Sequence, residues 1–382
     1  MAESKLKRLV DSPSTPLSVL GFIVAVLCGM VFGMSLEKGK VFLPTVIFSQ
    51  MLFRQFVMLK MFLCAATSSL ITLAFMSGVM PERFESTRRY LIDNDKGFIS
   101  ATVGALILGV GMTLAGSCPG NVIVQLGAGV TNAWIIVVGG LTASVVWGIL
   151  DKPLVKPMEG RCKPPFRRET VDSYFYKPYW ICAMGLAAMC AAVVAVCEYY
   201  VPWKDDLPPG VRLDKHSNTP LHPLARAWPP EVAGVLVGVL QWPVRYFFSD
   251  GLGSATSYCT ITAVPLKAIF GVGKLSERYT DCADQSNWWQ VVYLWIGATL
   301  GAFLSSYYSG VFNLQDGFHP AMCFFGGFCM LLGSRIAGGC TSGHGISGMA
   351  ELSLTSLVAV PMMFAGAIAT AFILEGANAA PV

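Results

Sequence analysis

The fold of this chain is decided by two stretches, Leu114-Ala-Gly-Ser-Cys-Pro-Gly-Asn121 and Ile336-Ala-Gly-Gly-Cys-Thr-Ser-Gly-His344. Each stretch ends a long apolar run and sets a cysteine among glycines and other small residues. When Cys118 and Cys340 are aligned, the segments GMTLAGSC and GSRIAGGC are identical at four of eight positions. Because glycine readily adopts the conformations that interrupt a helix, the two stretches predict one type of broken helix that occurs twice.

The composition around these stretches indicates an integral membrane protein. Of the 382 residues, 54% are hydrophobic and 13% are charged, and the mean hydropathy is +0.58. Soluble domains carry about 25% charged residues, so this chain is unusually apolar. Its apolar residues come in runs of about 20, enough to cross a bilayer core of about 30 Å. No basic stripe interleaved with aromatic residues occurs, which argues against a nucleic-acid-binding surface.

The lengths of the apolar runs predict the fold class. We expect an all-α integral membrane protein with about nine transmembrane helices and about four short re-entrant half-helices, since the shorter runs cannot cross a bilayer. The predicted spans are 17–36, 55–80, 97–116, 131–150, 179–200, 229–249, 289–311, 318–338 and 353–374. The predicted half-helices are 41–53, 120–130, 253–270 and 342–352.

Long and short pieces follow the same order in both halves of the chain. GFIVAVL at 21–27 also matches GVLVGVL at 234–240 at four of seven positions. A single span between two four-span repeats makes the second repeat run opposite to the first, so we expect inverted repeats with a site at their interface. The predicted regions are a tail at 1–16, repeat one at 17–150, a linker with the central span at 151–228, repeat two at 229–374 and a tail at 375–382.

The distribution of Lys and Arg predicts the orientation in the membrane. The side that holds the N-terminus carries 17 of these residues and the other side carries seven. Positive loops face the cytoplasm in most membrane proteins. We therefore expect a multi-pass protein of the cell membrane with a cytoplasmic N-terminus and an external C-terminus.

Most of the twelve cysteines predict no chemistry. Seven of them lie inside apolar runs, where cysteine usually packs as a small hydrophobic residue. The sequence has no CxxC and no Cys/His spacing typical of zinc sites. We therefore expect neither a metal site nor a cofactor.

Cys118 and Cys340 are the exceptions because of the helix breaks around them. A break frees backbone N–H groups, and a half-helix that begins there directs the positive end of its dipole to the same place. That environment favours an anion or a thiolate. The alternative is a packed glycine kink with inert thiols, but the repetition favours a substrate path. The predicted path also includes small and hydroxyl-bearing neighbours of the two cysteines: Gly116, Gly339, Thr341 and Ser342.

Four further residues are candidates for the same path. Arg335 lies inside an apolar run, and it is either a counter-charge for an anion or part of a structural ion pair. Cys259 follows a hydroxyl-rich piece and is either a third path residue or a packed thiol. His344 could donate to an anion or cap a helix. Asn121 could donate its amide N–H groups to an anion or hold the helix break.

At this level of detail the chain resembles the YeeE/YedE sulfur-transport family. The similarity rests on SCPGN followed by VIVQLGAG and on AGGCTSGHGISG, and the span layout extends it over roughly 17–374. The resemblance implies a nine-span inverted-repeat fold, and thiosulfate or a related sulfur anion as the substrate. It also implies that Cys118 and Cys340 pass the anion along by transient hydrogen bonds to sulfur. The family's Gly-Arg-x-Cys near the first span is here Gly39-Lys-Val-Phe42.

We therefore expect a transporter, not an enzyme, that imports a small sulfur oxyanion across the bilayer. Thiosulfate is a dianion with one soft sulfur end, so thiols and freed N–H groups suit its two ends. Two alternatives stay open: a membrane sulfurtransferase that forms a persulfide, and an exporter of sulfite or a related anion. By analogy with the family, a cytosolic sulfurtransferase is a possible partner.

Overall fold

The computed structural model describes residues 18–93, 96–151, 170–208, 211, 213–219, 221–270 and 277–380. In these residues the regular secondary structure is helical, apart from an isolated bridge between Thr170 and Ser353. The all-α prediction is thus confirmed. The predicted tail at 1–16 and most of the connector at 151–178 lie outside the described residues.

Eight helices among the described residues are long and apolar enough to cross a membrane, and they contain 18 to 24 residues each. At 1.5 Å per residue such helices are about 27 to 36 Å long, which matches a bilayer core. The chain is a multi-pass integral membrane protein. The eight helices are α2 (Val19–Lys38), α4 (Val57–Val79), α6 (Phe98–Ala115), α8 (Ala133–Leu150), α11 (Tyr179–Tyr200), the continuous helix Gln285–Tyr308, α18 (Pro320–Ala337) and α19 (Leu354–Gly376).

The sixth predicted span, at 229–249, is not one helix. It is divided into α12 (Pro230–Val239) and α13 (Gln241–Phe248). Pro243 lies near the start of α13, and its nitrogen cannot donate the hydrogen bond that Val239 O would accept in a continuous helix. Of the roughly nine predicted spans, eight are thus single long helices, and the remaining range is covered for the most part by these two consecutive pieces.

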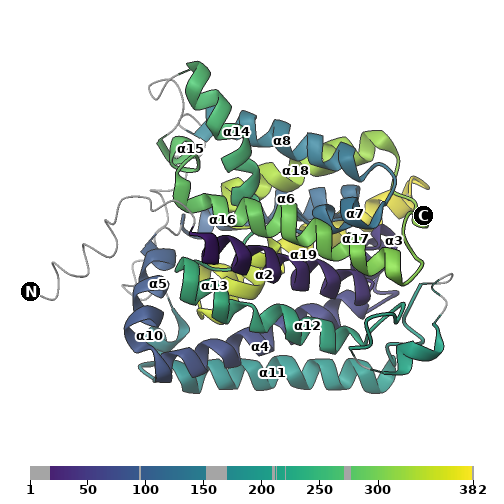
Figure 1. Cartoon of the computed structure of the whole chain (residues 1–382), viewed down its shortest axis with the longest axis horizontal. Helices are drawn as coiled ribbons and strands as arrows, with labels where there is room; N and C mark the ends of the chain where they lie inside the picture. The colour runs from purple at the N-terminus through teal and green to yellow at the C-terminus, as the bar shows by residue number, and fades with distance from the viewer. Residues whose placement is uncertain are drawn as a thin grey trace, which may run out of the picture.

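Short helices occupy the four ranges that were too brief to span a membrane. They are α3 (Pro44–Met51), α7 (Asn121–Ala128), α14 (Ala255–Phe270) and the π-helical turn η5 (Gly343–Gly348). Figure 1 shows α3 at the end of the molecule where the C-terminus lies. At the opposite end are α14, α5 (Pro81–Asp93), α10 (Val171–Phe175) and α15 (Glu277–Asp281).

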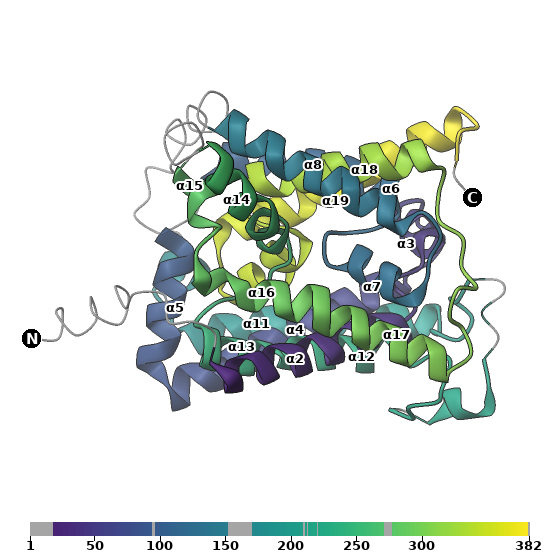
Figure 2. The ribbon, with the colours of Figure 1, turned by 45° about the horizontal axis from the view of Figure 1, so that its top comes forward.

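The long helices form two groups with the short helices between them. In one group α6 packs against α18 and α19, and α8 packs against α18. In the other group α4 packs against α11 and α12, while α2 packs against the helix Gln285–Tyr308. Figure 2 shows the two groups above and below α7 and α14. This arrangement brings the broken helices into the middle of the molecule.

Glycines let the helices of each group approach closely. A Cβ atom on Gly104 would lie 2.2 Å from the backbone nitrogen of Ala337, and one on Gly111 would lie 2.1 Å from that of Met330. Both positions therefore require glycine. Close backbone approach of this kind is usual between helices in lipid. Lipid tails are as apolar as the side chains, so the helices associate through tight packing and not through the hydrophobic effect. This packing fixes α6 and α18, the two helices that end in the cysteine motifs.

Candidate functional site

The first cysteine motif forms a sharp break after α6. Gly116 ends the helix in the left-handed conformation, with φ of +57°. A Cβ atom there would lie 2.6 Å from Pro44 Cβ and 2.7 Å from the ring of Phe318, so only glycine fits. The chain then passes through Cys118 and starts α7 at Asn121. Cys118 is thus at the break itself, half-buried, between two helices that point into the molecule.

Two amide side chains hold this break in place. Gln125 is fully buried and donates through Nε2 to Gly116 O and to Phe42 O, both at 2.8 Å. Asn121 donates through Nδ2 to Val41 O at 3.1 Å. This bond holds the helix break, and Asn121 also lies on the lining of the apolar cavity described below.

The second motif follows α18 in the same way. Gly338 ends the helix with φ of +87°, and Cys340 lies two residues later. A Cβ atom on Gly339 would lie 2.9 Å from the ring of His344, so the next turn closes tightly over the break. The thiol of Cys340 is 3.2 Å from Ser342 Oγ. The two breaks are therefore alike in backbone form as well as in sequence.

Ser254, in the segment before α14, connects the two motifs. Its backbone N–H lies 3.4 Å and its hydroxyl 3.2 Å from the sulfur of Cys340. A Cβ atom on Gly120 would lie 3.4 Å from Ser254 Oγ, so Ser254 also touches the first break. Tyr258 is buried beside both thiols and donates to Pro119 O at 2.9 Å. Cys118 and Cys340 thus lie close together at the centre of the molecule.

Two cavities of contrasting character reach this centre. The first is about 80 Å³ and almost wholly apolar, and it reaches Cys118. The second is about 190 Å³, has a lining that is about half polar, and reaches Cys340; we call it the polar cavity. The apolar cavity is lined by Phe32, Met58, Met61, Phe62, Met112 and Phe364 among others. The polar cavity is lined among others by Lys96, Asp250, Arg335, His344 and Glu351.

Arg335 is held at the wall of the polar cavity by three neighbours. Its guanidinium carbon lies 4.6 Å from the ring centroid of Trp147. Nη1 donates to Thr256 Oγ1 at 3.3 Å and Nη2 to the sulfur of Cys282 at 3.7 Å. In the part of the chain that the structure describes, its Nε has no hydrogen-bond partner. The structure thus presents a fixed cation, with a donor to spare, beside Cys340.

The other charged residues of the polar cavity also have partners: Asp250, for example, accepts from Gln290 Nε2 at 2.8 Å. Glu351 forms a buried ion pair with Arg245. Lys96 donates to Arg335 O at 2.6 Å and lies 5.2 Å from the ring of Trp147. His344 is 3.0 Å from Ser356 Oγ through Nδ1.

Cys259 and Thr341 are placed differently from the other candidates. Cys259 is fully buried, 3.2 Å from Ser144 Oγ, and it interacts with Cys282, outside both cavities. The hydroxyl of Thr341 lines the apolar cavity and donates to the sulfurs of Met112 and Met363, each at 3.3 Å.

Sequence reasoning missed Ser254, Lys96 and Tyr258. The only signal for Ser254 and Tyr258 was the hydroxyl-rich piece that precedes Cys259, and Lys96 was counted only as a topology residue. Among the described residues no group of three His, Cys, Asp or Glu side chains could hold a metal ion, and all the described cysteines are free thiols.

These features define a multi-pass membrane protein with two neighbouring free thiols at its centre. One thiol lies on the lining of an apolar cavity and the other on that of a polar cavity. The model of the sulphur transport family matches residues 38–369, and the chain belongs to that family. It is 24% identical over 356 residues to the thiosulfate transporter TsuA of Spirochaeta thermophila, covering 91% of this chain and 97% of the relative. It is 23% identical over 286 residues to the thiosulfate transporter TsuA of Escherichia coli, covering 70% and 72%.

Proposed function

We propose that this protein imports a small sulfur oxyanion, thiosulfate, through the centre where Cys118 and Cys340 meet. The single observation that carries the proposal is the position of these thiols, close to each other at two similar helix breaks, each on the lining of a cavity. The names of the two relatives point to the same substrate.

The two cavities suit the two ends of such an anion. Thiol S–H groups are weak donors that match the soft sulfur end. The sulfonate oxygens are harder acceptors and are better stabilised by N–H groups and by a cation. Arg335 and Lys96, at the wall of the polar cavity, would supply that positive charge. In the apolar cavity the anion would make only weak contacts, so it would not be bound too tightly to dissociate.

The remaining predicted path residues would support this route. Gly116 and Gly339 would keep the breaks open, and Ser342 would orient the thiol of Cys340. Asn121 would act through the backbone that it holds, and Cys259 through Cys282 and Arg335. Thr341 and His344 line the apolar and the polar cavity respectively, where their polar groups could meet the passing anion.

We also propose that the two halves of the fold are inverted repeats, residues 17–150 and 229–374, joined by the central α11. The similar breaks after α6 and α18 support this, as do the short helices between the two layers. The polar cavity, with Lys96 on the predicted cytoplasmic side, would then be the exit. A cytosolic sulfurtransferase that receives the anion there is part of the same proposal.

The test is uptake of ³⁵S-thiosulfate into sealed proteoliposomes. We expect Cys118→Ala and Cys340→Ala each to reduce uptake by about tenfold or more, the equivalent of one hydrogen bond to a charged group. The matched control is Cys190→Ala, which removes a buried thiol of α11 away from both cavities. Wild-type uptake by both Cys→Ala variants would refute the role of the thiols.

The same experiment separates the alternative functions. A sulfurtransferase would retain label on the protein, or release a new sulfur species, without a sealed compartment. An exporter of sulfite would show preference for that anion in counterflow from loaded vesicles. Accumulation of unchanged thiosulfate inside the vesicles, dependent on the cysteines, is the result that we expect.

A further inference from the structure

Tyr293 has a buried hydroxyl close to the thiol of Cys340, and the proposed route gives this hydroxyl no role. Its side chain is 2% exposed, and among the described residues its hydroxyl has no hydrogen-bond partner. A buried polar group without a partner loses its hydration and gains nothing in return. Such groups are rare in folded proteins and each calls for an explanation.

The surroundings of Tyr293 place it at the centre of the molecule. Its hydroxyl is within electrostatic reach of Cys340 and of Cys28. Its ring packs on Phe32, with centroids 5.5 Å apart. Phe32 lines the apolar cavity, and a Cβ atom on Gly120 would lie 3.4 Å from the tip of its ring. Tyr293 therefore lies close to Cys340 at the second break, and its ring partner Phe32 touches the first break.

The backbone holds Tyr293 rigidly in this position. It belongs to the π-helical segment η4 (Val292–Ala298), and such wide turns recur at functional sites. α2 packs directly on this segment, because a Cβ atom on Gly29 would lie 1.9 Å from Tyr293 O. The unpaired hydroxyl is therefore not free to turn away toward another partner by a small shift of its helix.

Tyr258 offers an instructive contrast within the same site. Both tyrosines are buried beside Cys340. The hydroxyl of Tyr258 is already bound to Pro119 O at 2.9 Å and thereby fixes the first break. Tyr293 has the same donor group in the same region but no acceptor among the described residues, which leaves its hydroxyl available to a bound ligand.

We infer that Tyr293 donates its phenolic O–H to an oxygen of the sulfur oxyanion as the anion passes between Cys118 and Cys340. The inference rests on the proposed function and adds a fixed oxygen donor to the two sulfur donors. A phenol suits this task because it is neutral, donates one strong hydrogen bond to an anionic oxygen, and releases the anion more readily than a buried cation would.

The test combines transport and stability for Tyr293→Phe, which removes only the hydroxyl. We expect thiosulfate uptake into proteoliposomes to fall by about tenfold. The thermal midpoint of the purified protein should be unchanged or a few degrees higher, because an unpaired buried hydroxyl has been removed. Replacing Tyr293 with 3-fluorotyrosine, which keeps the O–H, should preserve uptake.

Two control variants make the outcome decisive. Tyr258→Phe should lower the thermal midpoint, because Pro119 O loses its donor, and Tyr307→Phe, at an exposed position of the helix Gln285–Tyr308, should change neither property. The inference is overturned if Tyr293→Phe transports like the wild type, or if its midpoint falls as that of Tyr258→Phe does. Absence of uptake by the wild type would instead refute the proposed function.

Discussion

At the scale of single residues, the question is how an arginine can lie within an apolar helix. Arg335 is surrounded by an aromatic face, a hydroxyl and a thiol, from Trp147, Thr256 and Cys282. These neighbours contact the face of the flat guanidinium by stacking and its two Nη groups by directed hydrogen bonds, and leave Nε as a donor without a partner among the described residues. A lysine ammonium is a compact point charge that could not make the same set of contacts.

This geometry predicts different effects for two substitutions of Arg335. Arg335→Gln removes the charge and should reduce thiosulfate uptake by about tenfold at limiting substrate. Arg335→Lys keeps the charge but loses the stacking and should retain an intermediate rate. Initial rates in proteoliposomes would be compared with those of Arg89→Gln, whose side chain is 67% exposed. Wild-type rates in both Arg335 variants would remove this residue from the path.

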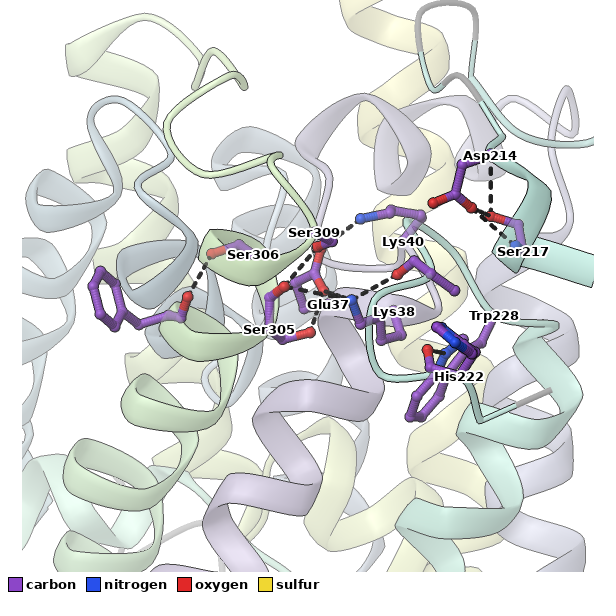
Figure 3. Close-up of polar contacts among 12 residues, drawn as sticks. Glu37, Lys38, Lys40, Asp214, Ser217, His222, Trp228, Ser305, Ser306 and Ser309 are labelled. Carbon is purple, nitrogen blue, oxygen red and sulfur yellow. Dashed lines mark hydrogen bonds and ion pairs between the residues drawn. The ribbon is translucent and has the colours of Figure 1, made fainter. Parts of the chain in front are cut away.

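At the scale of elements, the C-terminal end of α2 is fixed by buried charges (Figure 3). The carboxylate of Glu37 accepts hydrogen bonds from Lys40 and from Ser305 Oγ. Lys38 lies 3.7 Å from the same carboxylate and donates to Ala225 O at 2.7 Å. α2 is thereby tied to α17 (Thr299–Tyr308) and to the segment before α12, so one carboxylate compensates two buried ammonium groups.

We therefore expect Glu37→Gln to lower the free energy of unfolding by about 3–5 kcal/mol, since it leaves two buried cations without their counter-charge. The measurement is thermal unfolding of the detergent-solubilised protein, with Glu85→Gln, on the exposed face of α5, as the control. The double variant Glu37→Gln/Lys40→Met should recover part of the loss. A stability equal to that of the wild type would show that the cluster does not hold α2.

At the scale of the whole molecule, the open question is how the protein lies in the membrane. Figure 1 places α3 and the C-terminus at one end and α5 at the other. The end that contains α5 is the one where Lys and Arg gather in the sequence. The positive-inside tendency predicts that this end, and with it the polar cavity, faces the cytoplasm.

The assignment predicts the behaviour of reporter fusions. Alkaline phosphatase fused after Val382 should be active, because it folds only outside the cytoplasm, and green fluorescent protein at the same site should be dark. Fusions that end at Ser86, within α5, should give the opposite pair of results. If the C-terminal fusion to green fluorescent protein is bright, the orientation is reversed and the polar cavity faces outward.

Several elements could be predicted because their signals are local in sequence. Apolar runs of about 20 residues give spans wherever they occur, and runs of half that length give short helices, since length alone decides what can cross a bilayer. The break at Cys118 follows from glycine and proline in adjacent positions. The division of α12 from α13 was not predicted. Pro243 is visible in the sequence, but a proline near the end of an apolar run can either kink a helix or divide it, and the sequence does not distinguish the two.

Less of the candidate site could be predicted. Cys118 and Cys340 could be predicted because their motif occurs twice. The backbone acceptors of Asn121 and Gln125 could not, because they lie about 80 residues away, at Val41 and Phe42 respectively. Cys259 is a thiol in a stretch of small and hydroxyl-bearing residues, as Cys118 and Cys340 are in stretches of small residues. It nevertheless lies outside both cavities, close to Arg335 and Cys282. Its pattern in the sequence is the same whether the thiol faces a cavity or a neighbouring helix.

The sequence by itself determined that this protein is an all-helical membrane protein with two thiol-bearing helix breaks, because hydropathy, helix length and glycine conformation are properties of short segments. Only the tertiary structure decided that the breaks meet through Ser254 and that the cavities beside them differ in polarity. It also decided that the buried hydroxyl of Tyr293, close to Cys340, has no hydrogen-bond partner among the described residues. The reason is physical: a hydrogen bond or a cavity depends on atoms from several helices, and their proximity is fixed by packing across the whole molecule.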